Sequence, residues 1–143
     1  MEFKIFYDLN RDIINIRTEA FIIGRGVSPE IELDGRDSQL EHFCLYEGNK
    51  LLAYLRAEEA GKLVHIGRVA VCKEMRNHGL GRKLLEYLFE TVESRGFEGV
   101  ELSAVDTAVG FYEKLGFVGE GDYYMETGVP HIYMKYMFNK KDK

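Results

Sequence analysis

Cysteine is scarce in this chain, and long hydrophobic runs are missing. The 143 residues include two cysteines, Cys44 and Cys72, and both lie in apolar, strand-like segments. Neither their number nor their spacing predicts a disulfide framework or a zinc site, so we expect two reduced thiols in the core. No apolar stretch is long enough to cross a bilayer, and the N-terminus lacks the charged start and apolar run of a signal peptide. We therefore expect a cytoplasmic protein with no membrane partner.

An excess of basic charge is also missing. The chain has 19 Lys and Arg against 24 Asp and Glu, a formal net charge of −5, whereas non-specific nucleic-acid binding relies on a basic surface. The four histidines (His42, His65, His78 and His131) are too scattered to be ligands of one metal ion. We expect neither a nucleic-acid partner nor a metal cofactor.

What is present fits a single domain over residues 1–143. Hydrophobic periodicity predicts three helices. The first begins after an Asp8 cap and ends near Gly24, the second spans 81–95 and the third spans 107–115. Residues 24–38 are expected to form a loop with one helical turn. Two antiparallel hairpins around one β-α-β crossover predict an α/β (α+β) fold, in which a mixed sheet of about seven strands is flanked by about four helices. The tail 139–143 is expected to fray. Strands are expected at 2–6, 40–47, 50–58, 62–72, 98–104, 117–126 and 131–138.

The segment 69–85 is the most informative part of the chain. An apolar strand runs into a polar turn with the spacing Arg-x-x-Gly-x-Gly at 76–81, and an amphipathic helix follows. Gly79 and Gly81 lack a Cβ atom, so an anion can approach the backbone, and the first N–H groups of the helix have no acceptor within it. The spacing matches neither a P-loop nor the dinucleotide fingerprint. A plain turn with solvated basic side chains is the alternative, but strand, helix and flanking arginine together favour an anion site.

Two motifs resemble one protein family. Residues 76–81, Arg-Asn-His-Gly-Leu-Gly, resemble the Arg/Gln-x-x-Gly-x-Gly/Ala motif of the GNAT superfamily of N-acetyltransferases. Residues 111–117, Phe-Tyr-Glu-Lys-Leu-Gly-Phe, are similar to the second motif of that family, and one strand separates the two as the family requires. The resemblance implies a GNAT-like fold with a centrally splayed sheet.

Two further segments, 17–23 and 125–134, are similar to the small bacterial YjcF/ElaA-like subgroup of that family. Two positions depart from the pattern. Gly24-Arg25 stands where the subgroup often has Glu-Gln, and Val105 stands where the wider family often has an Asn that contacts the pantetheine arm.

The resemblance implies acetyl-CoA as the donor and direct transfer of its acetyl group to a primary amine of a small molecule in a ternary complex. The backbone at 69–71 would pair with the pantetheine arm, the N–H of Val71 would hold the oxyanion, and the glycine loop would hold the pyrophosphate. Members of the family often form homodimers, so a homodimer is one expected assembly. The residues implied to bind the cofactor are Val69, Ala70, Val71, Arg76, Asn77, His78, Gly79, Leu80, Gly81, Arg82, Lys83 and Phe111.

Tyr112 matches the general acid of the family, which protonates the departing thiolate. The alternative is a core aromatic, because Ala108 and Leu115 share its helical face. Glu126 is the first candidate for the base or for the anchor of the amine, although some family members use only water as the base. The other candidates have simpler explanations, as solvated loop carboxylates (Glu32, Asp34, Asp37) or as structural or turn-packing histidines (His42, His65, His131).

Three classes of function stay open at this point: an enzyme that acetylates an amine, an acyl-CoA-binding sensor without turnover, and an interaction domain that has lost the ligand. Within the enzyme class, the acceptor could be a polyamine, an aminosugar, an amino acid, an antibiotic or a protein terminus. The acidic segment before His42 favours a cationic acceptor.

Overall fold

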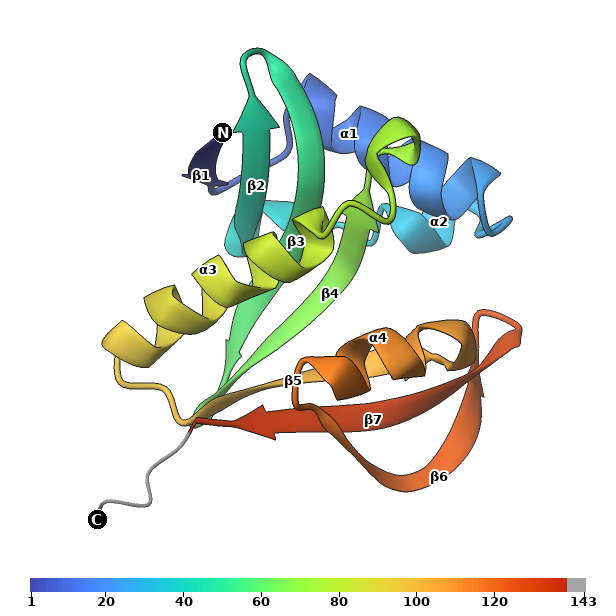
Figure 1. Cartoon of the computed structure of the whole chain (residues 1–143). Coiled ribbons are helices and arrows are strands. Elements are labelled where there is room, and N and C mark those ends of the chain that lie inside the picture. Colours follow the sequence, from blue (N-terminus) through green and yellow to red (C-terminus); the bar gives the residue numbers. More distant parts are fainter. Residues whose placement is uncertain (139–143) are drawn as a thin grey trace. The chain divides into compact units, whose positions relative to one another are not determined.

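The computed structural model describes residues 1–138, whose strands form one seven-stranded mixed sheet in the order β1-β2-β3-β4-β5-β7-β6 (Figure 1). β4 and β5 pair in parallel from Leu63 to His65, whereas β1-β2, β2-β3, β5-β7 and β6-β7 pair antiparallel. The predicted mixed sheet is confirmed, and the tail 139–143 lies outside the described residues. The strands are β1 (Glu2–Phe6), β2 (Glu41–Glu47), β3 (Lys50–Ala60), β4 (Leu63–Val71), β5 (Gly99–Val105), β6 (Val118–Glu126) and β7 (Val129–Met137).

The four α-helices of the described chain agree with the predicted number. The expected helical turn within 24–38 is α2, and the helix predicted at 107–115 is a 3-10 turn followed by α4. The helices are α1 (Arg11–Arg17), α2 (Pro29–Glu32), α3 (Leu80–Ser94) and α4 (Val109–Lys114), and 3-10 turns lie at Asp37–Gln39, Lys73–Met75 and Asp106–Ala108.

The cap of α1 differs from the prediction. The side-chain oxygen of Asn10 accepts the N–H of Ile13 at 2.9 Å, so Asn10 is the N-cap. Asp8 instead accepts the N–H of Leu9 at 2.7 Å. Asp and Asn are equally good caps, and the two residues lie two positions apart, so the sequence did not decide between them.

A π-helix continues α1 over Thr18–Ile23, which no sequence pattern predicted. The wide turn closes where the N–H of Gly24 donates to the carbonyl of Glu19 at 2.9 Å. A Cβ atom at Gly24 would lie 2.6 Å from the carbonyl oxygen of Ala20. The π-turn therefore requires glycine at this position, which gives a structural reason for the departure at Gly24-Arg25.

The chain divides into two compact units. Unit 1 consists of Met1–Glu58 and Gly67–Leu88, and its core holds side chains of α1, β2, β3 and α3, among them Ile13, Phe43, Leu55 and Leu85. No helix within residues 1–138 is long and apolar enough to cross a membrane.

Unit 2 consists of Glu59–Ile66 and the described residues from Phe89 onward. One face of its β5-β7 pair is apolar, with Val100, Leu102 and Met134 buried. The rings of Phe89 and Tyr136 stack with centroids 4.6 Å apart, and α4 lies along β5 (Figure 1). The opposite face carries polar side chains, which are described below.

Candidate active site

The predicted anion loop lies in unit 1, between the end of β4 and the start of α3. Asn77 and Gly79 have positive φ angles of 67° and 78°, and α3 starts where the N–H of Lys83 donates to the carbonyl of Gly79 at 3.0 Å. The N–H groups of the intervening first turn have no acceptor within the helix. Because residues 76–79 are exposed, this turn presents free donors and a positive helix end to an incoming anion.

Arg76 is anchored at the base of this loop. Its Nε donates to the carbonyl of Val71 at 3.1 Å, and Nδ1 of His78 lies 2.9 Å from the Arg76 carbonyl. Arg82 forms a solvent-exposed pair with Glu86 at 3.0 Å, one helical turn along α3. The loop therefore keeps two guanidinium groups close to the start of α3, with Arg76 fixed to the last residue of β4.

Tyr112 lies on α4 in unit 2 and is 8% exposed. Its ring meets the rings of Phe111 and Phe117 edge to face, with centroids 5.1 and 5.5 Å away. The ring thus belongs to the core of unit 2, as the plain alternative held. The role of its hydroxyl as an acid stays a prediction. Phe111, expected at the cofactor, is 39% exposed.

Glu126, the proposed base or anchor, ends β6 and is exposed. Its Oε1 lies 3.0 Å from Oγ of Ser103 on β5, and Oη of Tyr124 makes a short hydrogen bond to the same Oγ. An ionised carboxylate only accepts, so Ser103 donates to Glu126 and Tyr124 donates to Ser103. The hydrogen bonds therefore run from Tyr124 to Ser103 and from Ser103 to the carboxylate of Glu126. The sequence did not point to Ser103 or Tyr124.

His131 lies opposite Tyr124 in the β6-β7 pair and opposite Val105 in the β5-β7 pair. It is 4% exposed, and the Tyr124 ring stacks on the imidazole with centroids 6.4 Å apart. Its Nδ1 lies 3.0 Å from the carbonyl of Val129. A carbonyl only accepts, so Nδ1 carries a proton, and Nε2 is the ring nitrogen that can hold a lone pair. Its burial and its bond to Val129 agree with the predicted packing at the turn, and neither involves Nε2.

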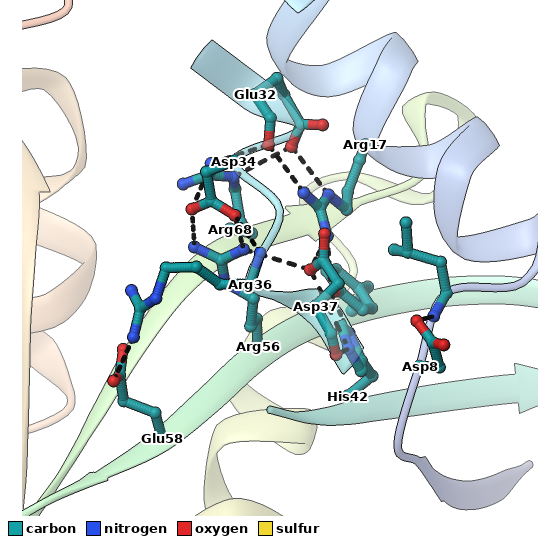
Figure 2. Close-up of polar contacts among 12 residues, drawn as sticks. Asp8, Arg17, Glu32, Asp34, Arg36, Asp37, His42, Arg56, Glu58 and Arg68 are labelled. Carbon is teal, nitrogen blue, oxygen red and sulfur yellow. Dashed lines mark hydrogen bonds and ion pairs between the residues drawn. The ribbon is translucent and has the colours of Figure 1, made fainter. Parts of the chain in front are cut away.

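A cluster of charges fills another part of unit 1, and its core is Arg17 (Figure 2). The guanidinium group is 1% exposed, and it lies 2.7 Å from a carboxylate oxygen of Glu32 and 2.6 Å from one of Asp37. Glu32 and Asp37 are themselves 2% and 4% exposed. The interpretation of these two acids as solvated loop residues is wrong, because each is buried against an arginine.

Two arginines from the strands complete the cluster (Figure 2). Arg56 on β3 lies 2.8 Å from Asp34 and 3.1 Å from Asp37, and Arg68 on β4 lies 3.0 Å from Glu32. These acids are neutralised from within, so they do not make a site for a cationic acceptor, contrary to the expectation from the sequence. An arginine within an apolar strand pattern, as at 51–57, was the signal that could have revealed a buried partner.

The arginines also set the ionisation of these acids. The hydrogen bond from Arg56 lowers the pKa of Asp34 from 3.8 to about 2. Burial acts to raise the pKa of Asp37, but the hydrogen bonds and charges of Arg17 and Arg56 outweigh it and the pKa is lowered. Both acids therefore stay ionised near neutral pH.

His42 lies beneath the cluster with both ring nitrogens bonded. Its Nε2 lies 2.9 Å from the carbonyl of Asp37, so Nε2 carries the proton, and Nδ1 accepts from Oη of Tyr54 at 2.6 Å. Burial lowers the pKa of His42. His65 on β4 pairs with Glu101 at 2.9 Å. His42 is a satisfied structural histidine, as predicted. Cys44 and Cys72 are free, buried thiols, also as predicted.

Comparison with known proteins gives a consistent result. Residues 24–138 match the family model described as acetyltransferase (GNAT) domain. The uncharacterized N-acetyltransferase YjcF of Bacillus subtilis is 29% identical over 87% of this chain and 89% of its own length. The crystal structure of an acyl-CoA N-acyltransferase from Pseudomonas aeruginosa superimposes with a TM-score of 0.81 and 30% identity, covering 95% of this chain and 99% of that one. Escherichia coli ElaA also reaches a TM-score of 0.81, with 25% identity over 95% of this chain and 99% of its own.

Proposed function

Because this chain belongs to the GNAT acetyltransferase family, we propose that it transfers the acetyl group of acetyl-CoA to a primary amine of a small molecule, directly and in a ternary complex. The similar Pseudomonas aeruginosa protein is described as an acyl-CoA N-acyltransferase, which supports an acyl-CoA donor. The family assignment makes the chain an acyltransferase. The acetyl group, the amine class and the roles below are the proposal.

The observation that carries the proposal is the loop between β4 and α3. Left-handed Asn77 and Gly79 turn the exposed backbone, and α3 begins immediately afterwards. Free N–H groups at a helix start, together with Arg76, Arg82 and Lys83, suit a pyrophosphate. The pyrophosphate of CoA is accordingly assigned to Arg76 and to the N–H groups of residues 77–83. The backbone of Val69, Ala70 and Val71 is assigned to the pantetheine arm, and the exposed ring of Phe111 to the cofactor.

Three groups are assigned to the chemistry. The acceptor nitrogen attacks the thioester carbonyl, and the N–H of Val71 stabilises the oxyanion that forms. The C–S bond then breaks, and Oη of Tyr112 gives its proton to the thiolate. Glu126 binds or deprotonates the amine, which suits an exposed carboxylate at the end of a strand. The transfer uses no metal ion and is assigned to the cytoplasm, where Cys44 and Cys72 stay reduced. All of these groups come from one chain, so a homodimer is compatible with the reaction but not required by it.

The test is an acceptor screen that measures free thiol released from acetyl-CoA, with a panel of polyamines, aminosugars, amino acids, aminoglycosides and peptides. We expect at least one small amine to be acetylated. Tyr112→Phe should lower kcat by roughly 10- to 1,000-fold and leave acetyl-CoA affinity unchanged. A parallel thermal melt should show stabilisation by acetyl-CoA, which amounts to about 2.7 kcal/mol at a hundredfold excess over Kd.

Each alternative gives a different pattern in these two measurements. A sensor would be stabilised by acetyl-CoA and would release no thiol with any amine. An interaction domain would show neither stabilisation nor thiol release. Acetylation of peptides alone would identify a protein N-acetyltransferase, and unchanged turnover in Tyr112→Phe would remove Tyr112 as the acid.

A further inference from the structure

One face of the sheet in unit 2 carries a group of polar side chains that the proposed function does not explain. Directly paired residues of antiparallel strands lie on the same face, so the pairs Tyr124–His131, Val105–His131 and Ser103–Tyr133 place these side chains together. The titratable and charged groups of this face, and of the turn beside it, are His65 (β4), Glu101 (β5), Asp106 (the 3-10 turn), Glu120, Tyr124 and Glu126 (β6), and His131, Tyr133 and Lys135 (β7).

Most of this face pairs with itself. His65 and Tyr133 both bond to Glu101, at 2.9 and 2.8 Å, and Lys135 lies 3.2 Å from Glu120. These groups neutralise or satisfy one another. His131 and Glu126 lie at the turn end of the hairpin, and each is held through one atom, Nδ1 of His131 by the Val129 carbonyl and Oε1 of Glu126 by Ser103.

The Nε2 atom of His131 is open in spite of the burial of the residue. Within residues 1–138, no side-chain nitrogen or oxygen is both fully buried and without a hydrogen-bond partner. No partner bonds to Nε2, while Nδ1 is held by the carbonyl of Val129. Nε2 is therefore not fully buried, although the residue as a whole is only 4% exposed. The bond from Nδ1 to the Val129 carbonyl sets the tautomer and orients the ring, which is how a protein prepares a histidine base, and the Tyr124 ring lies beside it.

We infer that His131 is the proton acceptor for the amine substrate, and that the Tyr124–Ser103–Glu126 chain forms the adjoining site for its ammonium group. This inference rests on the proposed function and divides the role first given to Glu126. Glu126 anchors the cation, since Ser103 engages only its Oε1. Tyr124 and Ser103 are positioning residues, because they act by holding the imidazole and the carboxylate.

The proton balance of the reaction closes without another reactant. Nε2 of His131 takes one proton from R–NH₃⁺, and the neutral amine attacks the thioester carbon. The C–N bond forms, the C–S bond breaks, and the thiolate takes the proton of Tyr112. The N–H proton that the new amide sheds restores Tyr112 through solvent, and His131 releases its proton to solvent. The products are the amide, CoA thiol and one proton.

His131→Asn is the informative variant, because the amide nitrogen still donates to the Val129 carbonyl while the basic nitrogen is lost. We expect kcat/KM to fall by roughly 10²- to 10⁴-fold, as for loss of a general base. The rise of kcat/KM with pH on the acidic side, which reflects loss of the imidazolium proton, should disappear. Thermal stabilisation by acetyl-CoA should not change. His65→Asn is the matched control, a histidine of the same face that is bonded to a carboxylate, and it should keep both the rate and the acidic limb.

Tyr112→Phe should lower kcat but keep the acidic limb, and Glu126→Gln should mainly raise the KM for the amine. If His131→Asn keeps wild-type kcat/KM and the same acidic limb, the inference is overturned while the proposed function stands.

A second measurement does not depend on turnover. Side-chain ¹⁵N NMR of the wild-type protein should show Nε2 of His131 without a proton, and n-butylammonium should shift that resonance in the wild type but not in Glu126→Gln. If the shift occurs but no amine is acetylated, the ammonium site stands and acetyl transfer fails. If the shift is absent in the wild type, the inference is overturned even where turnover is found.

Discussion

Nε of Arg17 lies 2.7 Å from a carboxylate oxygen of Glu32, and both side chains are almost wholly removed from solvent. The two residues come from α1 and α2, 15 positions apart. The bond therefore ties the segment that follows the π-helix back to the first helix. Arg68 reaches the same carboxylate from β4, so three elements of unit 1 meet at one acid.

Removal of the Arg17 charge should be costly. Arg17→Met keeps an apolar stem but leaves Glu32 and Asp37 short of a partner in a buried place. We expect the free energy of unfolding to fall by about 3 kcal/mol, the lower end for a broken buried pair, because Arg56 and Arg68 remain. Urea denaturation measures this. Arg36→Met is the control, since it breaks a solvent-exposed pair with Glu58 and should cost less than about 1 kcal/mol. Equal losses in the two variants would contradict the argument.

Stability should fall on acidification in two stages. Burial lowers the folded-state pKa of His42 below 6.5, so below pH 6.5 the unfolded chain takes up a proton that the folded one does not. The lowered pKa of Asp34 adds stability that is complete above 3.8 and is lost as the pH falls toward about 2. Denaturant unfolding between pH 8 and pH 2 should show both stages. Asp34→Asn should reduce the second stage, to which the lowered pKa of Asp37 also contributes, and leave the first stage unchanged. A stability that does not change from pH 8 to pH 5 would contradict the first stage.

Arg68 offers a test of backbone strain. Its φ angle is 55°, in the left-handed region that residues other than glycine rarely adopt. Arg68→Ala and Arg68→Gly lose the same ion pairs with Glu32, but only alanine keeps a Cβ atom in that conformation. We therefore expect the alanine variant to be less stable than the glycine variant by about 1 kcal/mol, reversing the usual order of the two residues. Thermal or urea unfolding of the pair measures the difference, and a more stable alanine variant would disprove the strain.

Backbone strain can be tested in the same way in the anion loop between β4 and α3. A Cβ atom at Gly79 would meet no atom within 4 Å, so its φ of 78° and not crowding demands glycine. Gly79→Ala should lower stability by about 1 kcal/mol, whereas Asn77→Gly, at a φ of 67°, should preserve or raise it. Both variants should be compared by urea unfolding without ligand. Equal effects of the two substitutions would show that the loop relaxes out of the left-handed region.

The cysteines should be slow to react in the folded protein. Burial raises the pKa of Cys44 to about 12 and also raises that of Cys72, so neither thiol ionises near neutral pH. A thiol reagent at pH 7.5 should label both only on the timescale of unfolding, and 6 M guanidinium should release two thiols at once. Rapid labelling of the native protein would contradict this and would also raise the background of the thiol-release assay.

Local patterns predicted the parts of the fold that local forces determine. The period of Leu84, Leu85, Leu88 and Val92 places α3 to within a residue at each end, because one face of that helix is apolar. The β4-α3 loop could also be predicted from the sequence, since its glycines and arginine lie within six residues. Ion pairs between residues far apart in the sequence could not be predicted. An acid at position 32 reads as solvated until Arg17 and Arg68 are known to face it.

The candidate site shows the same division. Glu126 and His131 could be picked out from the sequence because they are titratable residues beside a turn. Ser103 and Tyr124 could be connected to them only once the register of the strands was known. A register shift between Glu120 and Tyr124 in β6 brings Tyr124 opposite His131. One residue more or fewer in that irregularity would turn the ring to the other face of the sheet, and sequence periodicity does not fix the length of an irregular stretch.

The arginine cluster has a consequence for how segments of this chain can be exchanged with those of its relatives. The acids of residues 32–37 carry charge that is balanced from α1, β3 and β4. If a relative lacks the matching residues, a chimera that exchanges this segment alone would bury carboxylates without their arginines, or arginines without their carboxylates. Where the relative lacks the matching residues, a chimera should keep its stability only when positions 17, 56 and 68 are transferred together with residues 32–37, although these positions are scattered along the sequence.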